Sequence, residues 1–120
     1  MPFLNIQTSC VVSREQETEL KSHIGKAISL VPGKSEAYLL LSFRDNCRLW
    51  LGGSDKEPIA YIEAAIFANE GHFGYPAFTA AITQAFCDVL GIAPKRVYLK
   101  FEDIAAWSVG GQYIDRKMFG

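Results

Sequence analysis

Several features that would indicate a specialised class of protein are missing from this sequence. Its 120 residues include 12 Lys and Arg against 13 Asp and Glu, so there is no basic surplus to hold nucleic acid or a membrane surface. No stretch approaches the roughly 20 apolar residues of a membrane span. The N-terminus, MPFLNIQTSC, lacks the charged and apolar regions of a signal peptide. We therefore expect no nucleic-acid partner, no membrane association and a cytoplasmic location.

Cysteine is scarce, and motifs for metals and nucleotides are absent. The three cysteines, Cys10, Cys47 and Cys87, are widely spaced and form no CxxC pair, which is typical of reduced thiols inside a cell. His23 and His72 have no cysteine or carboxylate at ligand spacing. Neither GxGxxG nor a P-loop occurs. We expect no metal and no cofactor.

The sequence does contain a globular composition, with 49% hydrophobic residues, and a length that predicts a single domain over residues 1–120. Residues 2–8 alternate as a strand does, and Ser13 and Gln16 have the spacing of a helix capping box. An apolar stripe at helical spacing follows, and Pro32-Gly33 ends it. Residues 38–43 form an apolar run of strand length that we expect to be covered on both faces.

The same order of elements is repeated about 60 residues later in the chain. Residues 60–67 are apolar and of strand length, and a glycine-rich connection leads from them to Pro76, which suits the first turn of a helix. The helical stripe over residues 78–90 ends at Gly91, and residues 97–101 alternate as a strand. The chain therefore reads strand–helix–strand twice, which requires parallel pairing within each half.

Two such halves predict an α+β fold in which a four-stranded mixed sheet carries both helices on one face. The other face has no helix to cover it, so self-association is its simplest cover and we expect an obligate oligomer. Residues 107–120, with Gly110-Gly111 as a turn, predict a hairpin that could add an edge to a neighbouring subunit.

Pro2 directly follows Met1. Removal of Met1, the usual outcome before a small residue, would convert the Pro2 nitrogen into a free secondary amine. Such an amine is a strong base with a fixed conformation. A proline at this position is common, however, and is a weak signal until other residues support it.

Short motifs spread over the whole chain support a functional role for Pro2 by their order and spacing. They are Met1-Pro2, Gly33-Lys34 with Tyr38, Gly52-Gly53-Ser54 with Glu57-Pro58, residues 94–98 (PKRVY), Phe101 with Asp103, and Phe119-Gly120. In this pattern the sequence resembles the tautomerase superfamily, and most closely its macrophage migration inhibitory factor and D-dopachrome tautomerase group. The resemblance implies a homotrimer with three active sites at subunit interfaces and phenylpyruvate tautomerase-like activity on aromatic α-keto acids.

The resemblance also implies roles for individual residues. Pro2 would be the general base, and Lys34 would bind the substrate and help to keep the amine neutral. The backbone N–H of Phe67 would contact substrate, and Tyr98 would enter the pocket from an adjacent subunit. Tyr38 and Val109 match pocket-lining positions. Taken alone, each of these residues has an ordinary alternative as a solvated lysine, a sheet aromatic or a core side chain.

Three departures from the family pattern bear on function. A bulky Phe67 would narrow or reshape the pocket, and Ile59 and Ile62 replace the Cys-x-x-Cys of the vertebrate cytokine. Lys100, two residues after Tyr98 on the same strand face, would add positive charge at the pocket mouth and favour anionic substrates, unless it is an ordinary exposed lysine.

These departures keep a rival interpretation open. The chain could be a weakly catalytic or non-catalytic, cytokine-like interaction protein with a vestigial pocket, exported without a signal peptide to act on a cell-surface receptor.

Overall fold

Strands from both halves of the chain form one four-stranded sheet. In the computed structural model, which describes residues 1–118, the strand order is β2-β1-β3-β4. β1 (Pro2–Thr8) pairs in parallel with β2 (Leu40–Arg44) and antiparallel with β3 (Ala60–Phe67). β3 in turn pairs in parallel with β4 (Val97–Ile104). The mixed sheet and the parallel pairing within each half confirm the predicted fold class.

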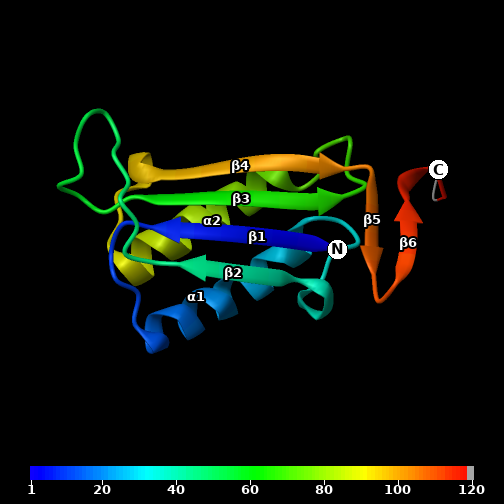
Figure 1. Cartoon of the computed structure of the whole chain (residues 1–120), viewed down its shortest axis with the longest axis horizontal. Coiled ribbons are helices and arrows are strands. Elements are labelled where there is room, and N and C mark those ends of the chain that lie inside the picture. The colour runs from blue at the N-terminus through cyan, green and yellow to red at the C-terminus, as the bar shows by residue number, and fades with distance from the viewer. Residues whose placement is uncertain (119–120) are drawn as a thin grey trace.

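Both helices, α1 (Arg14–Ala27) and α2 (Tyr75–Leu90), cover the same face of the sheet (Figure 1). α1 begins with the predicted capping box, in which the Gln16 N–H donates to Ser13 Oγ at 3.1 Å and the Ser13 N–H donates to Gln16 Oε1 at 2.9 Å. α2 ends at Gly91, whose φ of 68° is the left-handed conformation expected of a glycine C-cap.

The core lies between the helices and the sheet, and it contains the apolar stripes expected from the sequence. Its largest fully buried side chains are Phe78, Phe86, Leu4, Ile6, Leu20, Ile24, Ile28, Ile62, Ile66, Ile82, Ile92 and Val31. Gly25 lies inside α1 beside the carboxylate of Glu36, the flexible end of an exposed side chain, which a Cβ at this position would displace.

The expectation that residues 38–43 form a strand covered on both faces is wrong in two respects. Residues Glu36–Tyr38 form a short 3₁₀ helix, so the strand begins only at Leu40. Along β2 the side chains alternate between exposed and half-buried, and Leu40 is 60% exposed. The reason is that β2 is an edge strand with helices on one face only.

The start of β1 and the carboxyl ends of β3 and β4 meet at one end of the sheet, because β1 and β3 are antiparallel. A hairpin of β5 (Ala106–Val109) and β6 (Gln112–Asp115) crosses this end (Figure 1). The hairpin confirms the strand pair predicted for the tail. The Phe119-Gly120 motif lies outside the described residues.

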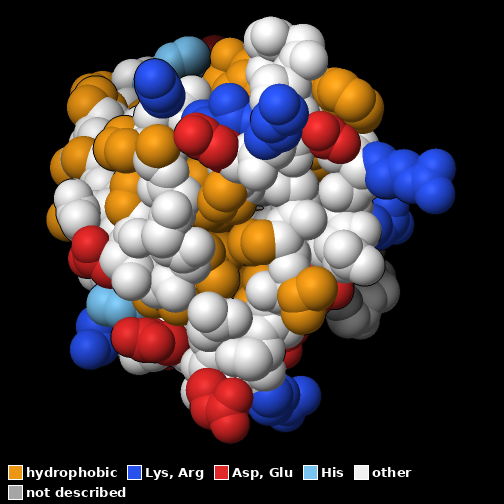
Figure 2. Space-filling view, turned by 90° about the vertical axis from the view of Figure 1, so that its left-hand side faces the viewer, with side chains coloured by type: hydrophobic (Ala, Val, Ile, Leu, Met, Phe, Trp, Pro, Cys, Tyr) orange, Lys and Arg blue, Asp and Glu red, His pale blue; other side chains and the backbone are white. Residues whose placement is uncertain are grey.

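The opposite end of the sheet carries the long loop between β2 and β3, and Figure 2 shows hydrophobic side chains lying there among charged ones. Trp50 on this loop is 67% exposed, and it lines a cavity of about 190 Å³ together with Tyr61 and Tyr98. Over residues 1–118, neither helix has the length and apolar character needed to cross a bilayer.

Candidate active site

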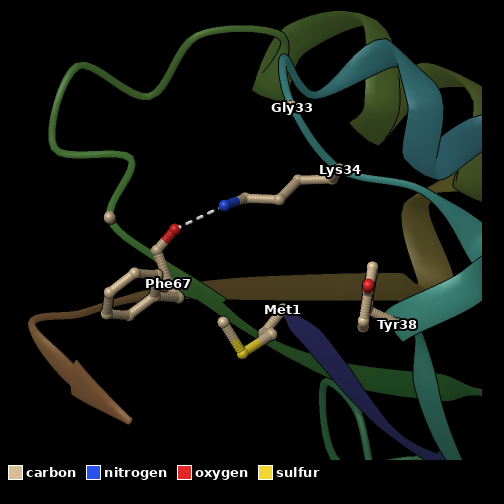
Figure 3. Close-up of a pocket in the computed structure, with 6 residues that line it drawn as sticks. Met1, Gly33, Lys34, Tyr38 and Phe67 are labelled. Carbon is tan, nitrogen blue, oxygen red and sulfur yellow. Dashed lines mark hydrogen bonds between the residues drawn. The ribbon is translucent and has the colours of Figure 1, made fainter. Parts of the chain in front are cut away.

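A cavity of about 290 Å³ opens at the end of the sheet where β1 begins (Figure 3). Its lining residues are Met1, Gly33, Lys34, Tyr38, Phe67 and Ala68. They come from the start of β1, from the connection between α1 and β2, and from the end of β3 and the turn after it. The antiparallel pairing of β1 with β3 is what brings the first residue of the chain beside Phe67.

Lys34 reaches across this cavity toward the end of β3. Gly33, with a φ of 76°, turns the chain after α1, and the Lys34 N–H donates to the carbonyl of Val31 at 3.1 Å. The Lys34 ammonium then donates to the carbonyl oxygen of Phe67 at 2.7 Å and lies 5.8 Å from the centre of the Phe67 ring. The ammonium is thus held within the cavity rather than extended into solvent (Figure 3).

Two amines share this small volume, and the Lys34 ammonium lowers the tendency of the N-terminal amine to carry a proton. Burial, and then the Lys34 ammonium, lower the pKa of the Met1 amine from 8.0 to about 6. Burial also lowers the pKa of Lys34, while its hydrogen bond to the N-terminus and the charge of Asp103 act in the opposite direction. At neutral pH the cavity therefore contains one mostly neutral amine beside one ammonium, an arrangement suited to proton transfer next to a developing negative charge.

Met1 also continues the β-ladder beyond the first residue of β1. The Phe67 N–H donates to the carbonyl oxygen of Met1 at 3.3 Å, and Pro2 is buried opposite Ile66. Removal of Met1 would place the new amine one residue further along β1, in a more buried position, and would take away this carbonyl acceptor.

A second cavity, of about 380 Å³, adjoins the first and shares Met1 and Tyr38 with it. Pro2, Leu40, Trp107 and Val109 are among its other lining residues, and they give it apolar walls. Across the two cavities the structure brings together five of the seven residues singled out from the sequence, namely Pro2, Lys34, Tyr38, Phe67 and Val109.

Tyr98 and Lys100 lie elsewhere in this chain, on the sheet face that the helices leave open. Lys100 forms ion pairs with Glu63 at 3.0 Å and Glu102 at 3.4 Å, and the Glu63 carboxylate raises the pKa of Lys100. Two carboxylates around one ammonium reduce the positive field that the lysine alone would supply. Since the resemblance assigns Tyr98 to a neighbouring subunit's pocket, a role for either residue there stays a prediction.

The sequence reasoning missed residues that hold the wall of the cavity. Asp103 accepts a hydrogen bond from the Asn69 N–H at 2.8 Å and pairs with Arg116, and Trp107 lines the second cavity. Asp103 had appeared only as part of a family pattern, and an isolated Asn or Arg carries no periodic signal. Within residues 1–118, no group of three or more His, Cys, Asp or Glu side chains is placed to hold a metal ion.

Solved structures of other proteins share this architecture. Among solved structures, MIF2 of Leishmania major has a TM-score of 0.87 to this chain at 22% identity, covering 95% of this chain and 97% of its own. Macrophage migration inhibitory factor of Toxoplasma gondii has a TM-score of 0.80 at 22% identity, covering 93% and 99%. The protein Pt0534, in a structure inactivated by 2-oxo-3-pentynoate, has a TM-score of 0.82 at 17% identity, covering 98% and 99%. At these identities the likeness establishes the fold.

A search among curated protein sequences gave no significant match. The family model described as macrophage migration inhibitory factor (MIF), by contrast, matches residues 1–113, which is nearly the whole chain. This chain therefore belongs to the macrophage migration inhibitory factor family.

Proposed function

We propose that this protein, once Met1 is removed, is a cofactor-free keto–enol tautomerase that acts on aromatic α-keto acids such as phenylpyruvate. The observation that carries the proposal is the N-terminal amine in a cavity beside Lys34, with its pKa lowered to about 6. Burial and the Lys34 charge would act in the same direction on the Pro2 amine, because Pro2 is buried at the start of the same strand.

In the proposed reaction, the neutral Pro2 nitrogen removes a proton from the carbon next to the ketone. Negative charge then develops on the ketone oxygen, where the Lys34 ammonium stabilises it. The protonated Pro2 nitrogen then gives this proton to the oxygen and becomes neutral again, so the tautomerisation moves one proton and needs no oxidant, reductant or metal. The Phe67 N–H would orient the carboxylate or the carbonyl of the substrate, at the place where the Met1 carbonyl accepts its hydrogen bond in the unprocessed chain.

Two further observations support this substrate class. The apolar second cavity, with Trp107 and Val109 in its wall, adjoins the amine and suits an aromatic ring. Pt0534, which is similar to this chain in fold, is inactivated by 2-oxo-3-pentynoate, and this compound is itself an α-keto acid.

We further propose that the active form is a homotrimer with no nucleic-acid or membrane partner. The open face of the sheet exposes Leu40 and Tyr98, and the hairpin of β5 and β6 extends beyond the sheet, where it could pair with a neighbour. Analytical ultracentrifugation would measure the assembly directly, and a monomer at micromolar concentration would contradict this part of the proposal.

A phenylpyruvate enol–keto assay on wild type and Pro2→Gly tests the base assignment, after mass spectrometry has verified the loss of Met1 in both proteins. We expect kcat/KM to fall roughly 10²-fold or more in the variant, the usual contribution of a positioned general base. Glu19→Gln, a substitution on the exposed surface of α1 that lines neither cavity, should retain full activity. If Pro2→Gly is as active as wild type, Pro2 is not the base.

The rival function is that of a non-catalytic interaction protein, and one observation favours it. The Lys34 ammonium already has an acceptor inside the chain, the Phe67 carbonyl at 2.7 Å, and this acceptor would compete with a substrate. A processed, trimeric wild type without measurable tautomerase activity would favour this second function.

A further inference from the structure

The turn that follows β3 begins with an alanine in an unfavourable conformation. Ala68 has a φ of 55°, in the left-handed region that residues with a Cβ rarely adopt. Its position matters because Ala68 lines the cavity and directly follows the carbonyl of Phe67 that holds the Lys34 ammonium. The left-handed turn at Ala68 therefore sets the direction in which that carbonyl points.

Two hydrogen bonds that the turn donates to β4 hold the strained residue in place. The Ala68 N–H donates to the carbonyl of Ile104 at 3.0 Å, and the Asn69 N–H donates to Oδ1 of Asp103 at 2.8 Å. The Asn69 side chain closes the turn on its other side, since its Nδ2 donates to the Phe73 carbonyl at 3.0 Å and its Oδ1 accepts from the Phe73 N–H at 3.2 Å. A strained residue persists only when its surroundings fix it in this way.

The C-terminal tail completes this arrangement through Arg116. Its Nη1 pairs with the remaining oxygen of Asp103, and its Nε lies 2.8 Å from a carboxylate oxygen of Glu70. The Arg116 backbone N–H donates to the Ala105 carbonyl at 2.9 Å, which fixes the tail itself. The guanidinium thus links β4 to the turn that carries the cavity wall, a bridge that its planar fork of donors can make and a single ammonium cannot.

We propose that Arg116 and Asp103 are positioning residues that hold the Ala68 turn and thereby aim the Phe67 carbonyl at the Lys34 ammonium. The consequence for activity rests on the proposed function, because it assumes that Lys34 binds the substrate. The positioning itself concerns only the folded chain and can be measured without a substrate.

The charge of Lys34 distinguishes positioning from a simple electrostatic effect. Within residues 1–118, the groups that act on Lys34 are the N-terminal amine and Asp103, and the Tyr38 phenol lines the same cavity. If Arg116 acted only as a charge, its removal would leave Asp103 less compensated and the pKa of Lys34 would rise. If Arg116 positions the Phe67 carbonyl, its removal weakens the hydrogen bond to the ammonium and the pKa of Lys34 falls. The two mechanisms predict opposite signs.

The experiment is an NMR titration of the Lys34 side chain in lysine-labelled protein, with the signal assigned by its loss in Lys34→Met. We expect the pKa of Lys34 to fall in Arg116→Gln and to fall at least as far in Arg116→Lys, which keeps the charge but not the fork. Lys117→Gln makes the same charge change at the neighbouring exposed position and should match wild type. Thermal unfolding of each variant verifies that it is folded.

An activity assay on the same proteins completes the test. We expect kcat/KM for phenylpyruvate to fall roughly tenfold or more in Arg116→Gln, because small misplacements of a binding group are costly, and to be retained in Lys117→Gln. A pKa of Lys34 that rises or is unchanged in Arg116→Gln overturns the positioning role. A wild type that is inactive on keto acids overturns the proposed function instead, and the titration still decides the role of Arg116.

Discussion

Replacing Lys34 by methionine tests the electrostatic coupling on which the proposed base depends. In the chain that retains Met1, the pKa of the N-terminal amine is lowered from 8.0 to about 6, by burial first and by Lys34 second. Lys34→Met keeps an apolar stem in the cavity wall but removes the ammonium. Because burial remains, we expect the pKa of the amine to rise from about 6 but to stay below 8.0.

The size of the effect follows from the neutral fraction of the amine. At pH 7 an amine with a pKa of about 6 is neutral and protonated in a ratio of about 10:1, whereas a pKa of 8.0 reverses the ratio to about 1:10. Lys34→Met should therefore lower the neutral fraction at pH 7 by anything up to about tenfold. In the processed protein, the same change should move the acidic limb of the kcat/KM profile toward higher pH, since the base must be neutral to accept a proton.

The assay is the rate at which the amine reacts with an arylating reagent as pH is varied, because only the neutral amine reacts. Mass spectrometry after proteolysis identifies the modified site. Lys56→Met, which removes an exposed lysine from the loop at the far end of the sheet, should leave the titration unchanged. A Lys34→Met titration that superimposes on wild type, or that shifts to lower pH, would refute the coupling.

Three further experiments test other parts of the structure. Gly74 has a φ of 81°, and a Cβ there would collide with the Leu30 carbonyl. Gly74→Ala should therefore lower the free energy of unfolding by clearly more than Gly91→Ala, which adds only the strain of a left-handed residue, about 1–2 kcal/mol. Thermal unfolding of the two variants measures the difference, which is due to the Leu30 contact. Ser13→Ala should lower the free energy of unfolding by about 1 kcal/mol through loss of the α1 cap, as measured by urea denaturation. Lys100→Asn should raise KM for a keto acid mainly at low salt, and a KM unchanged at every salt concentration would show that Lys100 does not attract the substrate.

Local patterns in the sequence were sufficient for the elements and for their order. The capping box at Ser13, the glycine C-cap at Gly91 and the helical stripes depend on neighbours within a few residues, and the structure confirms them. The prediction that β2 is covered on both faces was wrong because coverage depends on what lies beside the strand in space. The composition of this leucine run predicts a strand with both faces buried, but the edge position of β2 leaves Leu40 exposed.

The candidate site divides in the same way. The amine and Lys34 could be proposed from the sequence because they match a pattern carried by side-chain identity. The turn at Ala68 could not be predicted, because an alanine in the sequence gives no sign of a positive φ. The hydrogen bond that supports the turn joins Asn69 to Asp103, 34 positions away.

The inner position of β1 has a consequence for the timing of synthesis. Met1 is partly buried in the folded chain and its carbonyl accepts a hydrogen bond from Phe67, so an aminopeptidase reaches it more easily before β3 pairs with β1. β3 ends at Phe67, and translation at roughly 5–20 residues per second leaves roughly 3–13 seconds between the emergence of the two segments from the ribosome. Removal of Met1, which frees the proposed catalytic amine, therefore competes in time with the pairing of β1 and β3.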